Sequence, residues 1–500
     1  MPFHDMLVDR YGGIVKIRGF FGTEQLYISD PRALQSIILK DQESFDETSV
    51  FLETNKVIFG PGLVSTAGHQ HKRQRKIVFP VFSVAHLKGL TPVFYEVAER
   101  VGAFTAPTFS NVLADVIDTE ASRNEDSVID MADWMARAAL ETVGQTILGY
   151  SFDPLDSPHN NQYTSAIKDL IPTLFKLSLV RQLAPFLTRL GSRDFRRTLV
   201  EWTPVPAVQA VKGMSDVMYD TARGLLRQKQ EEVKRGVVQD RKSVIGALLK
   251  ANDEASAADK MDEDELIGQI TVLIFGAQDT TASSLTRLLH TLSLHPEVQD
   301  KLRNEVAEAV SEGGRLEYDA VMSLPWLDAV LKETMRLYPP VPFVRRTTLK
   351  EQAVPLADTS NLPAQIKDAG SVTIPAGTIF FTSIAGANRL ESVWGGDARE
   401  WKPERWLQGD RAAVTGVERL PGIYSGIMSF LGGERACVGY KFAQLEIKIL
   451  LVTLLQRFRF APTKQNGEIV WNLSQILSPS VRTQDGKERK GMPLGVERVI

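Results

Sequence analysis

Apolar positions recur with a helical period from about residue 31 to residue 335, so most of the chain is expected to be α-helical. An extended pattern precedes this region, because residues 14–20 (IVKIRGF) and 25–29 (QLYIS) flank a glycine-containing turn and predict a β-hairpin. Further β runs flank the Pro-Ala-Gly turn at residues 375–377. These patterns predict a mainly α fold with a small β-rich lobe, at about residues 11–60 and 371–386.

The longest predicted helix runs from residues 262–265 (DEDE) to about residue 293, before His295-Pro296. Acidic residues in its first turn suit the helix dipole, and its apolar positions extend nearly all round, which predicts a central buried helix. Polar residues 278–281 (QDTT) interrupt it, and polar side chains at that depth require partners. Thr280 either bonds back to a helix carbonyl or marks a local widening that leaves a groove for a small ligand and ordered water.

Other segments have weaker patterns. Asp30-Pro31 opens a helix through residue 40, with proline at its first position. Residues 440–460 predict an amphipathic helix, although residues 457–460 also fit a short strand, and residues 476–479 are expected to form a loop. Residues 165–190 are apolar with scattered Lys and Arg, and their two prolines limit helix length there. That segment is either a buried helix or a surface that touches membrane.

Composition narrows the class of protein. Hydrophobic residues make up 43% of the 500 residues and charged residues 24%, as in ordinary globular proteins. The sequence contains no linker-like or repeated segment, so residues 1–500 are expected to form one domain. A net charge of -3 gives no reason to expect nucleic acid as a partner. We find no secretion signal and no run of about 20 apolar residues that would span a membrane.

The only cysteine, Cys437, lies in residues 430–439 (FLGGERACVG). A lone cysteine is usually a small buried hydrophobe, but its neighbours here favour a metal-binding thiolate. Arg435 lies two residues before the sulfur, and the glycines allow the backbone to approach a flat group. The helix predicted directly afterwards places Cys437 near a helix N-terminus, where the dipole also favours negative charge.

This loop resembles the haem-binding loop of the cytochromes P-450, the haem-thiolate monooxygenases. Their pattern, Phe-x-x-Gly-x-Arg-x-Cys-x-Gly, is matched at Phe430, Gly433, Arg435, Cys437 and Gly439. The resemblance covers nearly the whole chain from about Tyr11 and favours fungal members of the family. It implies the cytochrome P-450 fold, with a long central helix over haem b, and it implies that the Cys437 thiolate ligates the iron.

Four further signatures follow the family's order. His71 and Arg75 are four apart on one helical face, and the resemblance implies that they bind haem propionates; a solvated basic face is the alternative. Residues 276–281 (GAQDTT) match the family's groove, in which Asp279 and Thr280 would relay protons to dioxygen. Ala277 replaces the family's usual glycine, so the groove is expected to be slightly tighter.

Glu333 and Arg336 are three apart on a helix, where an isolated pair would be a weak surface bridge. The resemblance instead makes them, with Arg405, a buried ion network that supports the cysteine loop. It assigns Arg346 to a haem propionate, with Arg345 close enough to leave the choice open. The residues expected to line the substrate space are Phe275, Ala277, Val341, Val344, Ile476 and Leu477.

The resemblance implies a monooxygenase that inserts one oxygen atom from O2 into an apolar organic substrate, in secondary metabolism. Electrons would come from NADPH through a separate flavoprotein reductase that docks on positive charge. The expected docking residues are Lys72, Arg73, Arg75, Lys76 and Lys441. Alternatives within the same fold are a peroxygenase, an isomerase or a dehydratase, and an alternative of another class is a catalytically silent binding protein.

Only the resemblance to the family indicates where in the cell the protein is located. Eukaryotic members usually begin with a membrane helix, which this sequence lacks. The resemblance still implies the cytosol-facing surface of the endoplasmic reticulum, reached by an anchor absent from the gene model or by peripheral membrane contact. Nothing in the sequence identifies the substrate or its regiochemistry.

Overall fold

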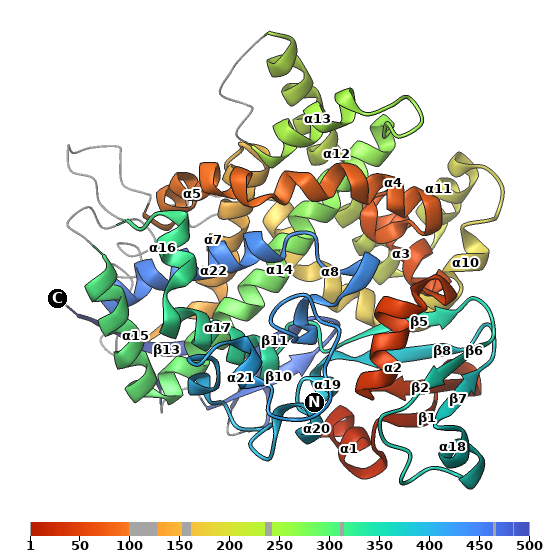
Figure 1. Ribbon diagram of the computed structural model, residues 1–500. Helices are drawn as coiled ribbons and strands as arrows, with labels where there is room; N and C mark the ends of the chain where they lie inside the picture. The colour runs from red at the N-terminus through yellow and green to blue at the C-terminus, as the bar shows by residue number, and fades with distance from the viewer. Residues whose placement is uncertain are drawn as a thin grey trace. The chain divides into compact units, whose positions relative to one another are not determined.

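The structure is a computed structural model that describes residues 2–99, 128–152, 162–235, 243–310, 315–463, 467–483 and 485–499. These residues form two compact units (Figure 1). The first unit comprises Met1–Ser49, Pro325–Tyr440 and Trp471–Leu477, and the second comprises Val50–Leu324, Lys441–Val470 and Ser478–Ile500. The expectation of a single domain over residues 1–500 stays a prediction.

A five-stranded sheet forms the β-rich part of the first unit. In sheet order its strands are β1 (Ile14–Arg18), β2 (Glu24–Ile28), β8 (Ile379–Ser383), β5 (Phe343–Thr348) and β3 (Phe45–Asp46). The β1–β2 pair confirms the predicted hairpin. β2 and β8 are parallel, whereas the other neighbours are antiparallel. The sheet therefore joins segments that are more than 300 residues apart in the sequence.

Helices and a second hairpin complete the first unit. They are α1 (Pro2–Tyr11), α2 (Pro31–Gln35), α17 (Pro325–Leu337), α18 (Ala364–Ala369), α19 (Ile384–Ala387), α20 (Glu391–Trp394) and α21 (Asp410–Ala413), with the hairpin β6 (Gln352–Pro355) and β7 (Ser371–Ile374). The Asp30 carboxylate starts α2 by accepting hydrogen bonds from two backbone N–H groups, and a π-helical turn extends α2 to Lys40 as expected. The two β runs around residues 375–377 are present, but they belong to different sheets.

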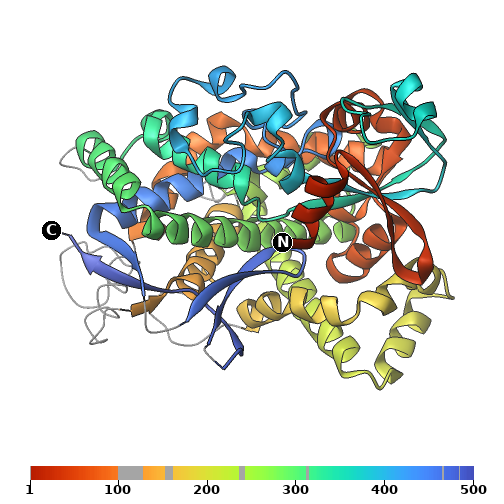
Figure 2. The ribbon, with the colours of Figure 1, turned by 90° about the horizontal axis from the view of Figure 1, so that it is seen from below.

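The second unit is helical. Its helices are α3 (Ser49–Phe59), α4 (Gly68–Val78), α5 (Val84–Glu99), α7 (Met131–Val143), α8 (Gln162–Lys176), α9 (Ser178–Gln182), α10 (Ala184–Leu187), α11 (Arg193–Trp202), α12 (Pro206–Lys234), α13 (Val244–Glu254), α14 (Glu263–Leu294), α15 (Pro296–Ala309), α16 (Tyr318–Ser323) and α22 (Tyr440–Arg457). The long helix α14 confirms the prediction, and a capping box between Asp262 and Glu265 fixes its start. α14 packs against α7 and α12 (Figure 2).

Short strands end the chain: β9 (Phe458–Pro462), β10 (Glu468–Leu473), β11 (Leu477–Arg482), β12 (Glu488–Lys490) and β13 (Pro493–Arg498), which pairs with β9 and with β4 (Val128–Asp130). Two local predictions were wrong, that of an amphipathic helix at residues 440–460 and that of a loop at residues 476–479. α22 is buried nearly all round, and it ends at Arg457, where the strand also expected at residues 457–460 follows as β9. α8 contains Pro172 but ends at Lys176, and α9 and α10 are short, as the limit on helix length predicted. Leu477 begins β11 and does not lie in a loop.

Within the described residues, no single helix is both long and apolar enough to cross a membrane.

Candidate active site

The loop that contains Cys437 is closed by its own backbone. The Cys437 N–H donates to the carbonyl of Phe430 at 2.9 Å, and the loop ends where α22 begins at Tyr440. The Phe430 ring packs against the rings of Tyr424 and Tyr440, with centroids 5.6 and 6.1 Å away. The side chain of Cys437 is exposed. The loop therefore presents a sulfur atom just before a helix N-terminus, as the sequence predicted.

Two glycines of this loop have a structural role that the sequence did not indicate. Gly433 has a φ of +64°, and a Cβ atom there would lie 2.1 Å from the carbonyl oxygen of Ile38. A Cβ atom on Gly432 would lie 2.0 Å from the carbonyl oxygen of Pro421. Both positions therefore require glycine because the loop packs on the chain's own backbone. The Glu434 N–H adds a hydrogen bond of 3.1 Å to the side chain of Gln42.

The structure separates the two neighbouring arginines, Arg345 and Arg346. They lie on one strand, so their side chains point to opposite faces of the sheet. Arg346 is buried and pairs with Glu47 at 2.7 Å. Burial lowers the pKa of Arg346, and the nearby charge of Arg435 lowers it further. Arg346 therefore shares its surroundings with the arginine of the cysteine loop.

An acidic pair that the sequence analysis missed, Asp46 and Glu47, faces these arginines. Arg435 donates to Asp46 at 2.6 Å, beside the Arg346–Glu47 pair. Burial raises the pKa of Glu47, and the two arginines oppose that rise. The four side chains form a cluster of alternating charge, and no local sequence pattern could have found it.

Glu333, Arg336 and Arg405 form one buried network. Arg336 makes two parallel hydrogen bonds to the Glu333 carboxylate, at 2.7 and 2.8 Å, and both side chains are fully buried. Arg405 lies 3.5 Å from the same carboxylate, and the Trp406 indole N–H donates to it at 2.9 Å. The structure therefore brings together the three residues that the resemblance assigned to a scaffold.

This network reaches the start of the cysteine loop through two polar side chains. Arg336 donates to the carbonyl of Asn388 at 2.9 Å, and the Asn388 side chain accepts a hydrogen bond from the Met428 N–H at 2.7 Å. Asn388 also donates to Ser429 at 3.0 Å. Met428 and Ser429 immediately precede Phe430, so the buried charges restrain the segment that leads into the loop.

The middle of α14 is accessible at one short stretch. Gly276 is exposed and Phe275, Ala277, Asp279 and Thr280 are half-buried, whereas the flanking turns are buried. The helix is continuous from Glu263 to Leu294, and the local widening stays a prediction. Gly276 and Ala277 have little or no side chain at this stretch. The Thr280 hydroxyl donates to the Gly276 carbonyl at 2.7 Å, as the simpler interpretation expected.

Two carboxyl groups near this stretch have raised pKa values. Burial raises the pKa of Asp279 to about 6, and Lys490 opposes the rise. Glu446 of α22 is fully buried beside the hydroxyls of Thr281 and Thr142, and burial raises its pKa well above the usual range. The Thr281 and Thr142 hydroxyls oppose that rise in the pKa of Glu446. Such groups indicate a polar interior that can hold ordered water. The sequence analysis missed Glu446 because an acid in a helix normally marks a solvated face.

His71 and Arg75 share one face of α4, as predicted. His71 is buried, and the Arg75 guanidinium lies 5.7 Å from the centre of the Phe79 ring. The basic cluster around them is not uniformly solvated, because Arg73 donates to Glu265 and Lys76 pairs with Asp259 at 2.9 Å. These two pairs leave less positive charge for a docking partner than the sequence suggested.

The residues expected to line the substrate space fall in both units. In the first unit, Val341 and Val344 are half-buried, and the Leu477 N–H donates to the carbonyl of Pro340 at 2.9 Å. Leu477 and Ile476 are therefore held beside the segment that begins at Val341. In the second unit, the Phe275 ring packs on Phe59, with centroids 4.8 Å apart.

The donor set fits a haem. Among the described residues, no three His, Cys, Asp or Glu side chains gather into a metal site of their own. One exposed cysteine before a helix can supply a single thiolate ligand to an iron whose other ligands come from a macrocycle. Arg346 and Arg435 already bind carboxylates, which is the chemistry that a propionate requires.

Comparison with known proteins identifies the family. The model of the cytochrome P450 family matches residues 2–484. Cytochrome P450 monooxygenase 91 from Postia placenta is 38% identical over 502 residues, which cover 99% of this chain and 88% of that protein. Ganoderic acid synthetase from Ganoderma lucidum is 36% identical over 496 residues, covering 94% of this chain and 85% of that protein.

The chain belongs to the cytochrome P450 family. Within that family it is a monooxygenase, an oxidoreductase that uses haem and O2, and its relatives are fungal.

Proposed function

We propose that the Cys437 thiolate ligates the iron of haem b in an NADPH-dependent monooxygenase that oxidises an apolar organic substrate. The observation that carries this assignment is the exposed Cys437 side chain, on a loop that the hydrogen bond from the Cys437 N–H to the Phe430 carbonyl closes just before α22. When bound, the haem supplies the redox chemistry by which one oxygen atom of O2 enters the substrate. The protein residues bind and orient the reactants and move protons.

Four cationic or imidazole side chains would hold the haem propionates: His71, Arg75, Arg346 and Arg435. Arg346 is preferred to Arg345 because it is buried near Arg435, the arginine of the cysteine loop. Phe430, Gly433 and Gly439 would shape the loop against the haem. Glu333, Arg336 and Arg405 would act only through that loop, as positioning residues.

Asp279 and Thr280 would deliver protons to the reacting oxygen. The Thr280 hydroxyl already donates to a backbone carbonyl at the accessible stretch of α14, so it can present its own oxygen to an ordered water. Buried Glu446 would hold a proton beside Thr281 on the inner side of the helix. A pKa of about 6 suits the Asp279 carboxyl group to proton exchange near neutral pH.

Thr280→Ala is expected to separate electron consumption from product formation. The variant lacks the hydroxyl group that would deliver protons. The rate of product formation should therefore fall about 10²-fold, while NADPH consumption continues and hydrogen peroxide accumulates. Thr286→Ala is a matched control, because it removes the same kind of back-bond, from Thr286 to the Ala282 carbonyl at 2.6 Å, elsewhere on α14. If the ratio of product formed to NADPH consumed were equal in Thr280→Ala and in the control, the proposed proton relay would be refuted.

The pKa of Asp279, about 6, predicts a pH dependence that Asp279→Asn abolishes. Its protonated fraction falls as the pH rises through about 6, so the proton-delivery step should slow over that window in the wild type only. The raised pKa also means that this carboxyl destabilises the folded state increasingly as the pH rises from 3.8 to about 6, and by a constant amount above that. Asp279→Asn should therefore raise the free energy of unfolding at pH 7.5 by about 3 kcal/mol while lowering turnover. Stopped-flow kinetics and denaturant unfolding would measure the two effects.

The family uses a redox partner, and we propose an NADPH-dependent flavoprotein reductase that docks near Lys72 and Lys441. Turnover that requires NADPH and reductase would separate a monooxygenase from a peroxygenase, isomerase or dehydratase of the same fold. Turnover with hydrogen peroxide alone, at an equal rate, would favour the peroxygenase. The intact Asp279-Thr280 pair favours the monooxygenase.

Peripheral contact with the endoplasmic reticulum membrane is proposed from the apolar surface of α9–α11. Large exposed side chains gather on these helices and just before them: Phe175, Leu179, Val180, Leu183, Phe186, Leu187, Phe195, Leu199 and Trp202. Such a surface is unusual unless it contacts another apolar phase. Loss of vesicle binding in Phe186→Ser/Trp202→Ser would support this proposal, and unchanged binding would refute it.

The substrate is proposed to be an apolar secondary metabolite. One relative is named as a ganoderic acid synthetase, and this chain shares 36% identity with it. Screening terpenoid, fatty-acid and aromatic compounds for shifts of the Soret band would identify the class that binds near the iron.

A further inference from the structure

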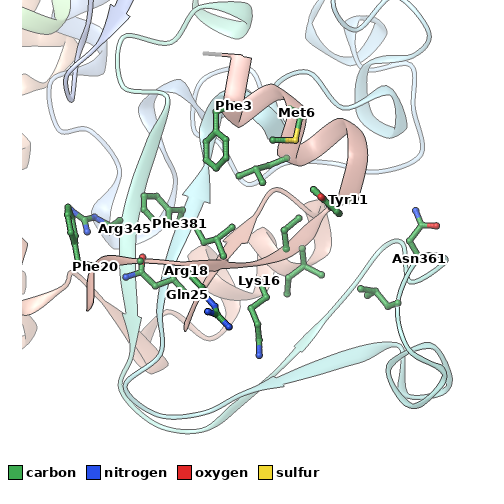
Figure 3. Close-up of a pocket in the computed structure, with 16 residues that line it drawn as sticks. Phe3, Met6, Tyr11, Lys16, Arg18, Phe20, Gln25, Arg345, Asn361 and Phe381 are labelled. Atoms are coloured by element: carbon green, nitrogen blue, oxygen red, sulfur yellow. The ribbon is translucent and has the colours of Figure 1, made fainter. Parts of the chain in front are cut away.

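A cavity of about 960 Å³ lies in the first unit, beside α1 and the edge strand β1 (Figure 3). It is formed mainly by Phe3, Met6 and Leu7 of α1, Val15 and Ile17 of β1, and Phe381 of β8. None of its lining residues belongs to the candidate active site. Phe3 is 56% exposed, so the cavity is open to solvent on the side of α1.

The pairing of the strands places apolar side chains along the cavity and a positively charged side chain at one end. The register aligns Val15 with Tyr27, Tyr27 with Phe381, and Phe381 with Arg345. These four residues therefore share one face of the sheet and form a row across four strands. Neighbouring strands are about 4.8 Å apart, so Arg345 lies about 14 Å along the sheet from Val15. The row of mainly apolar side chains therefore ends at the positive charge of Arg345.

Arg345 is a half-buried cation that has no carboxylate partner among the described residues. Its guanidinium lies 5.6 Å from the centre of the Phe381 ring, and burial lowers its pKa. In contrast, Arg346 on the opposite face pairs with Glu47. None of the described residues that line the cavity is acidic. A charge that is removed from water without a partner is unfavourable, and a bound anion would supply that partner.

Two more positively charged side chains lie on the opposite face of the edge strand β1. Lys16 and Arg18 also line the cavity, and Figure 3 shows their side chains on the side of β1 away from Phe3. Lys16 pairs with Glu24 at 2.8 Å, so its charge is partly neutralised. Arg345 is therefore the cation best placed to meet an anion inside the apolar part of the cavity.

We propose that this cavity binds one molecule of a free long-chain carboxylate, and not a micelle or a lipid surface. The carboxylate pairs with the Arg345 guanidinium, whose fork matches two oxygens. The alkyl chain lies over Phe381 toward Val15 and Ile17, under the apolar side chains of α1. The site is separate from the proposed haem site and does not depend on it, because the two share no residue.

Photocrosslinking of the holoenzyme with a diazirine-labelled dodecanoate, below its micelle concentration, tests the proposal. Crosslinks should map to residues 3–20 and to Phe381, and unlabelled dodecanoate should compete better than dodecanol. Arg345→Gln should weaken binding about tenfold, as expected for a lost charge-assisted pair. Arg411→Gln, which changes an exposed arginine of the same unit, should have no effect. Val15→Trp should block the cavity while retaining Arg345.

Each contrary result would overturn the proposal. Crosslinks that map elsewhere, or that persist in both Arg345→Gln and Val15→Trp, would exclude this site. Equal competition by dodecanol would show that the cavity does not select a carboxylate. Binding only to phosphatidylglycerol vesicles would assign this face to a lipid surface. Binding near the iron shifts the Soret band, so an Arg345-dependent crosslink without that shift identifies a separate site.

Discussion

Cys437→Ala is expected to abolish both turnover and the thiolate Soret band of the reduced, carbon monoxide-treated protein. The chain has one cysteine, so no other thiolate can replace the iron ligand. Its side chain is exposed, and its backbone N–H, which holds the loop on Phe430, is retained in the variant. The loop should therefore keep its shape while the ligand is lost.

Absorption spectra of the purified protein, with and without added haem, would measure this effect. Far-ultraviolet circular dichroism would show whether the variant folds. Cys437→Ser is the matched variant, because it keeps a similar volume and supplies a weaker oxygen ligand; it should also lose the thiolate band. If Cys437→Ala kept both the band and turnover, the assignment of the iron ligand would be wrong.

Glu333→Ala is expected to destabilise the protein by about 3–5 kcal/mol, the usual effect of leaving a buried charge without its partner. Glu333 is fully buried and accepts hydrogen bonds from Arg336 and from the Trp406 indole, so the variant leaves buried donors unsatisfied. A loss of this size is a large part of a typical folding free energy. Much of the variant should therefore be unfolded or free of haem.

Denaturant unfolding of the wild type and variants would measure the loss. Arg399→Ala is the matched control, because Arg399 pairs with Asp9 at an exposed site in the same unit and such pairs contribute about 0–1 kcal/mol. Glu333→Gln keeps the shape and some hydrogen bonds, so its effect should lie between the two. Equal losses in Glu333→Ala and the control would show that the network does not support the fold.

Local sequence patterns predicted the elements whose causes are local. The hairpin β1–β2 follows from alternating residues around a turn, and α14 follows from a capping box and a long apolar period. The loop around Cys437 was found because its glycines, arginine and cysteine are adjacent in the sequence. For the hairpin and for α14, the interactions that define the element lie within a few turns of chain, whereas the glycines of the cysteine loop also pack against Ile38, which is distant in the sequence.

The predictions that failed depended on packing between distant segments. Residues 440–457 contain Glu446 and Lys448 and were expected to have a polar face, yet both side chains are buried in the structure. No property of a single segment shows whether its charged face meets solvent or another helix.

The sequence by itself determined which residues carry the chemistry: one cysteine before a helix, an acid and an alcohol in a long apolar helix, and two adjacent arginines. Only the tertiary structure decided the environment of each arginine. Neighbouring strand residues face opposite sides of a sheet, and the pairing of β5 with β3 and β8 sets which side each one meets. That pairing places Arg346 against Glu47 and Arg345 in an apolar cavity, because strand register depends on partners far away in the chain.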